Sequence, residues 1–124
     1  MKKNRTHKMF IEDIFDAINK IEKYLEGFSY EKFSVNEMVV DAVVRNFEII
    51  GEAANNIPKE IREKYNDIPW KEIRGLRNLV AHEYFGVDKS IIWEIAKKDL
   101  PEIKPKIELL LKNLGGNGDE DNCL

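Results

Sequence analysis

The amino-acid sequence predicts an all-α fold, an up-and-down bundle of four to five helices. Three observations support this prediction: apolar residues recur at intervals of three and four, no segment alternates like a strand, and the connections are short. A chain of 124 residues is long enough to form one domain with a hydrophobic core. We expect that domain to occupy residues 1–114. Residues 115–124 are polar and rich in glycine, so we expect a disordered tail there.

The first half of the chain contains two long periodic segments. An apolar stripe over residues 6–26 predicts the first helix, and Gly27 is a suitable stop for it. Ser34 and Glu37 have the spacing of a capping box, in which a serine hydroxyl and a glutamate carboxylate satisfy exposed amides at a helix start. The second long helix is therefore expected to begin at Ser34 and to end at residues 55–56, a pair of asparagines.

The second half of the chain contains a short helix and two longer ones. A proline precedes the short helix predicted over residues 59–65, and the next helix begins at about Trp70. Asp88 is a suitable N-cap for the last helix. Because two prolines fall within the apolar stripe of that helix, we expect a kink or break near Asp99. The two prolines are Pro101 and Pro105.

The composition narrows the range of functions. The formal net charge is -3 and the pI is about 5.5, whereas proteins that bind nucleic acid over a wide surface are usually basic. Any contact with RNA is therefore expected at a local site. The single cysteine, Cys123, cannot form an internal disulfide, and no segment fits a signal peptide or a membrane span. We expect a soluble, cytoplasmic protein.

Residues 74–84 concentrate the polar side chains that could carry chemistry, including two arginines, an asparagine, a histidine and a tyrosine. On a regular helix, Arg77 and His82 would lie about 140° apart, at about 100° per residue. For both to reach one phosphate, the helix must end or distort near His82, or the long arginine must reach around. Spacing alone also fits an ordinary solvated helix end, because the helix dipole favours a histidine in the last turn.

The other polar residues suit a solvent-facing surface. His7 lies among basic residues near the start of the chain and is expected on the surface. Glu12, Asp13 and Asp16 lack the Glu-x-x-His partner found in di-iron bundles. The sequence contains no glycine-rich phosphate loop and no Cys/His spacing for zinc. We therefore expect neither a metal site nor a cofactor.

The ordered motifs resemble one known family. Arg77-Asn78-x-x-x-His82-x-Tyr84 is similar to the Arg-x4-His-x-Tyr signature of the HepT-like toxins, a branch of the HEPN superfamily of helical-bundle ribonucleases. The resemblance covers roughly residues 9–113. Other segments that resemble the family are residues 45–54 (Arg-Asn-Phe-Glu-Ile-Ile-Gly-Glu-Ala-Ala), Pro69-Trp70, Trp93-Glu94 and Asp99-Leu100-Pro101.

The resemblance implies a function and its partners. It implies a HEPN-like bundle that forms a homodimer, in which the two motifs approach each other, and that cleaves RNA as a metal-independent endonuclease. It further implies the toxin of a type VII-like toxin–antitoxin system. The antitoxin would be an MntA-type nucleotidyltransferase, which adenylylates the tyrosine of the motif, here Tyr84, and thereby silences the toxin.

The chemistry of the motif residues is compatible with this function. Imidazole is the side chain whose ordinary pKa suits proton transfer near neutrality, which favours His82. Arg77 offers a permanent charge and a planar fork that matches phosphate oxygens. We assign these two residues as catalytic, with Asn78 and Arg74 in support. An ion pair with Glu83 or Glu72 explains Arg74 equally well.

Two other functions remain open at this point. The chain could be a non-catalytic helical interaction module that is only a partner or substrate of a nucleotidyltransferase, and its overall acidity favours this reading slightly. It could also be a nucleotide-binding regulator, in which Arg77 and Asn78 hold a phosphate without cutting RNA.

Overall fold

A computed structural model of the chain describes the backbone of residues 6–83 and 88–122, and the side chains of residues 6–79 and 88–114. All regular elements in these ranges are helices, which confirms the all-α prediction. None of them is long and apolar enough to cross a membrane. In chain order they are α1 (His7–Tyr24), α2 (Tyr30–Ser34), α3 (Glu37–Asn55), α4 (Lys59–Lys64), α5 (Trp70–Glu83), α6 (Lys89–Glu94), the π-helix η1 (Ile95–Asp99) and α7 (Leu100–Asn122).

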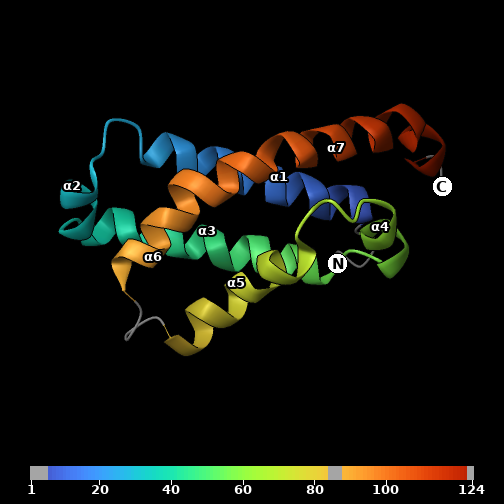
Figure 1. Ribbon diagram of the computed structural model, residues 1–124. Helices are drawn as coiled ribbons and strands as arrows, with labels where there is room; N and C mark the ends of the chain where they lie inside the picture. The colour runs from blue at the N-terminus through green and yellow to red at the C-terminus, as the bar shows by residue number, and fades with distance from the viewer. Residues whose placement is uncertain (1–5, 84–87, 123–124) are drawn as a thin grey trace.

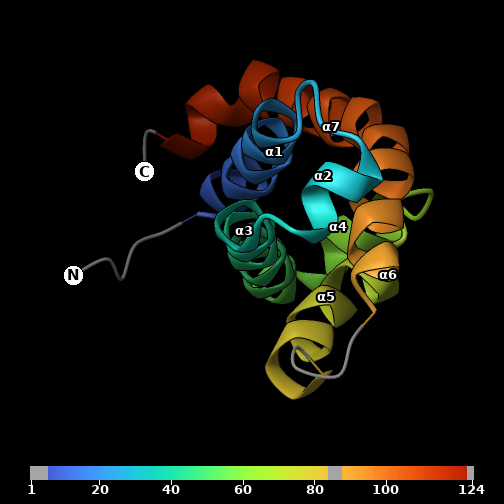
Figure 2. The same ribbon diagram turned by 90° about the vertical axis from the view of Figure 1, so that its left-hand side faces the viewer.

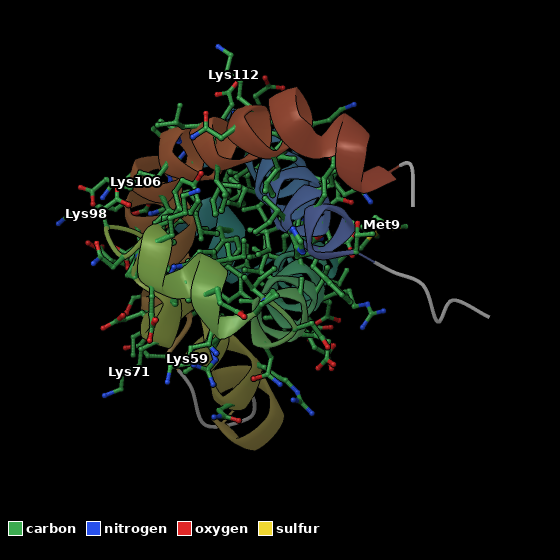
Figure 3. All side chains as sticks on the ribbon, turned by 90° about the vertical axis from the view of Figure 1, so that its right-hand side faces the viewer. Met9, Lys59, Lys71, Lys98, Lys106 and Lys112 are labelled. Atoms are coloured by element: carbon green, nitrogen blue, oxygen red, sulfur yellow. The ribbon has the colours of Figure 1, made fainter. Side chains whose placement is uncertain are left out.

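The long helices pack in the order α7, α1, α3 and α5, so that α3 lies between α1 and α5 (Figures 1 and 2). Each long helix turns one apolar stripe inward, as the three- and four-residue spacing predicts. Labelled lysines such as Lys71 and Lys112 project outward (Figure 3). The largest fully buried side chains are mainly isoleucines, with phenylalanine and leucine: Ile11, Ile14, Ile18, Ile21, Leu25, Phe33, Phe47, Ile50, Ile68, Ile73, Ile92 and Leu100.

The predicted start of the second long helix is wrong. Ser34 is the last residue of the short helix α2, and its hydroxyl donates to the carbonyl oxygen of Glu31 at 3.0 Å. α3 begins at Glu37, and its N-cap is Asn36, whose side-chain oxygen accepts from the amide of Val39 at 3.0 Å. The capping box expected from Ser34 and Glu37 is therefore absent.

The short helix α2 exists because it buries an aromatic side chain. Phe33 is fully buried, and its ring lies 5.2 Å from that of Trp93, centroid to centroid. Burying a phenylalanine stabilises a fold by roughly 1.5–3 kcal/mol, which outweighs a local preference for one cap over another. The partner ring belongs to α6, far along the chain, so the local pattern around Ser34 gives no sign of this contact.

The remaining boundaries of the first three long helices follow the sequence prediction closely. Thr6 caps α1 and accepts from the amide of Met9 at 3.3 Å. Gly27, in the turn after α1, has a φ of 78°, which glycine adopts without steric cost. α3 ends at Asn55, and α5 begins at Trp70.

Pro101 follows a widened turn of the helix instead of ending it, and Pro105 lies inside α7. Asp88 caps α6 as predicted and accepts from the amide of Ser90 at 2.9 Å. The chain then forms the π-helix η1, in which the amide of Leu100 donates to the carbonyl of Ile95. Pro101 has no amide proton to donate, and its ring would collide with a carbonyl in a regular turn. The interruption expected near Asp99 is thus present as a π-helical turn.

At the C-terminus α7 runs to Asn122, and the side chains of residues 115–122 lie outside the described ones. The disordered tail expected over residues 115–124 therefore stays a prediction.

The corrected cap leads to a first prediction. Asn36→Ala should lower the free energy of unfolding by about 1 kcal/mol, because an amide at the start of α3 loses its partner. Ser34→Ala removes only a surface hydrogen bond and should change that free energy by less than about 0.5 kcal/mol. Urea denaturation followed by circular dichroism measures both. If Ser34→Ala lowered the free energy of unfolding more than Asn36→Ala, Ser34 and not Asn36 would be the residue that caps α3.

Candidate functional site

The candidate site lies where α5 crosses α3, two helices that lie side by side in Figures 1 and 2. The crossing is close because Gly51 of α3 has no side chain. A Cβ atom added there would lie 2.6 Å from the backbone nitrogen of Arg77 and 2.8 Å from its Cβ atom. Both distances are shorter than any van der Waals contact. The backbone of α5 at Arg77 therefore rests directly on the backbone of α3.

The side chain of Arg77 is held by the residue that follows Gly51. The Nε atom of Arg77 lies 3.2 Å from Oε1 of Glu52, and the two side chains are 51% and 57% exposed. An ion pair this exposed contributes only about 0–1 kcal/mol to stability. The pair therefore determines where the guanidinium lies more than it determines how stable the fold is.

A hollow opens beside this ion pair, with charged side chains of both signs around it. It is formed by α1, α3 and α5, and Arg45 and Glu48 form a second ion pair along its α3 wall, at 3.0 Å. Its lining residues are Phe10, Asp13, Arg45, Glu48, Ile49, Glu52, Ala53 and Arg77. An arginine in a hollow open to solvent can meet a phosphate group, whereas the carboxylates around it oppose broad binding of a polyanion.

The supporting residues of the motif share the exposed side of α5. Arg74 and Asn78 are both exposed, and they lie three residues before and one residue after Arg77. On a regular helix these three positions fall within an arc of about 100°. No ion pair joins Arg74 to Glu72 among the described side chains. The explanation of Arg74 by that ion pair therefore finds no support, while a pair with Glu83 lies outside the described side chains.

The other two motif residues lie at the edge of the described structure. The backbone of His82 belongs to α5, one residue before its last residue, Glu83. Its side chain, and all of Tyr84, lie outside the described residues. The backbone stays α-helical from Trp70 to Glu83, so no distortion brings residues 77 and 82 onto one face. In this helix the two positions are about 140° apart. Both side chains can therefore contact one phosphate only if the arginine reaches around the helix or if a second copy of the protein supplies the histidine.

The chain is anchored again directly after the motif. The pKa of the Asp88 carboxyl lies below its usual value, because it accepts hydrogen bonds from the backbone and side chain of Ser90. Lys89 donates to the carbonyl oxygen of Ser34 at 3.0 Å, which ties the start of α6 to α2. Arg77, Asn78 and His82 thus belong to α5, which rests on α3, and the next helix along the chain, α6, is attached to α2.

Of the residues expected on the surface, Asp13 lines the hollow, whereas His7 and Glu12 are not among its lining residues. Lys8 and Glu12 form an ion pair 3.9 Å apart on α1, one turn from each other, which is typical of a solvated helix face. His7 is partly exposed at the first position of α1. Within the described part of the chain, no group of three or more histidine, cysteine or acidic side chains could hold a metal ion.

Gly51 and Glu52 are not predicted from the sequence as site residues, although both lie in the segment that carries the family resemblance. One signal was available for Gly51, because glycine inside a long helix costs up to about 1 kcal/mol and usually marks a packing requirement. Glu52 had no such signal. An isolated glutamate on an amphipathic helix has the pattern of a solvated residue, and its contact is with a helix 25 positions further along.

Comparison with known proteins adds a second line of evidence. The sequence matches the model of a family described as Ribonuclease HepT-like over residues 14–110. It is 44% identical over 120 residues to "Putative RNase MJ1216" of Methanocaldococcus jannaschii, a match that covers 97% of this chain and 98% of that protein. It is 41% identical over 108 residues to "Probable ribonuclease HepT" of Thermococcus cleftensis, covering 87% of this chain and 98% of that protein. No solved structure matches the chain.

The close crossing leads to a second prediction. Gly51→Ala should lower the free energy of unfolding, because overpacking costs about 1–3 kcal/mol while the better helix propensity of alanine returns at most about 1 kcal/mol. Gly75→Ala, on α5 itself, is the matched control. A Cβ atom at Gly75 meets nothing within 4 Å, so this variant should gain up to about 1 kcal/mol. Urea denaturation measures both, and equal stabilities would refute the close contact at Gly51.

Proposed function

The chain belongs to the family of HepT-like ribonucleases, and from that premise we propose that it is the toxin of a toxin–antitoxin pair. In this proposal it is an endoribonuclease that cleaves RNA without a metal ion. The observation that carries the proposal is the position of Arg77. Its guanidinium is half-exposed in an open hollow, and its backbone rests on α3.

Cleavage without a metal ion requires three contributions from side chains. A base takes the proton of a ribose 2′-hydroxyl, and the 2′-oxygen forms a bond to phosphorus. The bond from phosphorus to the 5′-oxygen breaks, and an acid delivers a proton to that leaving oxygen. A cation stabilises the additional negative charge on the phosphate in the transition state. We assign the proton transfers to His82 and the cationic role to Arg77.

A homodimer solves two problems of this assignment. One histidine cannot act as base and acid in the same step, whereas a two-fold dimer supplies His82 twice. Arg77 and His82 also occupy positions about 140° apart on a regular helix, so one α5 does not easily present both to one phosphate. Two copies of α5 that meet at a two-fold axis could place the arginine of one protomer near the histidine of the other.

The neighbouring polar residues extend the same exposed face. Asn78 follows Arg77 directly, and its amide can position either the imidazole or a phosphate oxygen. Arg74 lies one turn earlier and adds positive charge on the side where RNA would approach. In the proposal both are supporting residues.

Regulation is proposed at Tyr84, two residues after His82. A nucleotidyltransferase antitoxin of the MntA type would transfer AMP from ATP to the tyrosine hydroxyl, which loses its proton, and pyrophosphate would leave. The added group is bulky and anionic, and its phosphate would lie close to the cationic motif. It would therefore exclude RNA from the site both by its volume and by its charge.

The second candidate is a non-catalytic module, either an interaction partner or a nucleotide-binding regulator. The carboxylates of Asp13, Glu48 and Glu52 around the hollow favour it, because they oppose the binding of RNA. A ribonuclease assay with a chelator present separates the two. Cleavage that resists the chelator and requires His82 supports the enzyme, whereas tight binding of a mononucleotide without RNA turnover supports the regulator.

The catalytic assignment leads to a third prediction. His82→Ala and Arg77→Ala should each lower RNA cleavage at least about a hundredfold, the usual cost of removing a group that stabilises a transition state. Both should retain the dimer and the helical content. Arg45→Ala is the matched control, since Arg45 lines the same hollow but pairs with Glu48, and it should stay within about twofold of wild type. Cleavage retained by a clean His82→Ala preparation would rule out the mechanism.

The regulatory assignment leads to a fourth prediction. When the protein is co-expressed with its nucleotidyltransferase, intact mass should increase by one or more AMP groups, located on Tyr84 by peptide fragmentation. Tyr84→Phe has no hydroxyl to accept AMP and should show no increase. Tyr24→Phe, which changes an exposed tyrosine of α1, should be modified like the wild type. AMP found on the Tyr84→Phe protein would contradict the assignment.

A further inference from the structure

The ion pair between Arg77 and Glu52 differs in kind from most ion pairs on this surface. Pairs such as Arg45–Glu48 and Lys98–Glu94 join residues one turn apart on the same helix. Such pairs form wherever opposite charges have the right spacing. The Arg77–Glu52 pair instead joins α5 to α3, so its geometry depends on how the two helices pack.

The two helices are fixed relative to each other at the same place. Gly51, the residue before Glu52, contacts the backbone and Cβ atom of Arg77. Consecutive residues of α3 thus contact the two ends of one arginine, its main chain and its guanidinium. An arginine side chain has many rotamers, and a contact at each end restricts them before any ligand arrives.

The atom that Glu52 contacts is also informative. A guanidinium has five N–H donors in a planar fork, and a phosphate is best bound by two of them in parallel. Glu52 approaches Nε, the nitrogen nearest the side-chain stem. The two terminal Nη groups form the opposite end of the planar fork, and each carries an N–H bond that points forward, away from Nε. They are the end of the guanidinium that can donate to two phosphate oxygens at once.

We propose that Glu52 is a positioning residue for Arg77, which holds the guanidinium by Nε and presents its Nη groups to the scissile phosphate. This inference rests on the proposed ribonuclease function. Its carboxylate has two opposite effects on the reaction. It orients the arginine for the transition state, which raises kcat, and its negative charge repels the phosphate in the ground state, which raises KM.

These opposite effects give a signature that a purely structural ion pair lacks. Glu52→Ala should lower kcat by about tenfold to a hundredfold, the usual result of misplacing a catalytic group by about 1 Å. It should also lower KM by roughly twofold to fivefold, the size of an exposed charge interaction. Glu52→Gln keeps an oxygen that can accept from Nε without the charge. It should therefore show the lower KM and retain most of the wild-type kcat.

The control is Glu63→Gln. Glu63 is an exposed glutamate of α4 that pairs with Lys59 at 3.8 Å, and it is not among the residues that line the hollow. This variant should leave both kcat and KM within about twofold of wild type, as a surface substitution usually does. A double-mutant cycle adds a second test, because lysine has no Nε group and no fork. In the Arg77→Lys background, Glu52→Ala should therefore cause no further loss of kcat.

A measurement without substrate tests the orientation itself. In protein labelled with ¹⁵N at arginine, the Nε–H signal of Arg77 should be protected from exchange in the wild type. Protection should be partly retained in Glu52→Gln and lost in Glu52→Ala. A wild-type protein that protects this signal but cleaves no RNA would refute the ribonuclease function and leave the positioning intact. Two results would overturn the inference: a Glu52→Ala protein with the wild-type kcat, or a Glu52→Ala protein in which the Arg77 Nε–H signal is as protected from exchange as in the wild type.

Discussion

The contact between Gly51 and the backbone of Arg77 is the constraint on which the rest of this site depends. Packed helices usually keep their axes about 8–10 Å apart, because side chains separate them. A helix can come closer only where the facing residue has no side chain, and here that residue is buried at the α3–α5 crossing. The position of α5 relative to the rest of the bundle is therefore set at the residue that carries the motif's first charge.

Energetically, this constraint is a local cost offset by packing nearby. Glycine inside α3 costs up to about 1 kcal/mol relative to alanine. The side chains of Ile73 and Leu76 on α5 are only 2% and 6% exposed. Burying each such side chain stabilises the fold by roughly 1.5–3 kcal/mol. The burial gained along α5 thus exceeds the cost of the glycine. The close approach is compatible with a stable fold and still leaves the polar side of α5 open to solvent.

The sequence predicts those parts of the structure that depend on neighbours along the chain. Apolar stripes, the Asp88 cap and the proline-induced interruption near Asp99 are local patterns, and the structure contains all three. The start of α3 was misplaced because the burial of Phe33 depends on Trp93, far along the chain. The role suggested for Glu52 was missed for the same reason. The motif predicts Arg77 and Asn78, and the polar cluster before it predicts Arg74, but the contact that holds Arg77 comes from another helix.

The proposed function gives a physical reason for the negative net charge of the chain. A catalyst gains rate only from interactions that are stronger in the transition state than with the bound substrate. Carboxylates around Arg77, contributed by Asp13, Glu48 and Glu52, weaken the attraction of the hollow for any phosphate. The attraction that remains is concentrated at the guanidinium, where negative charge increases as the phosphate reacts. A net charge of -3 therefore disfavours indiscriminate RNA binding. The cationic stabilisation of the transition state is assigned to Arg77, which Glu52 holds in place.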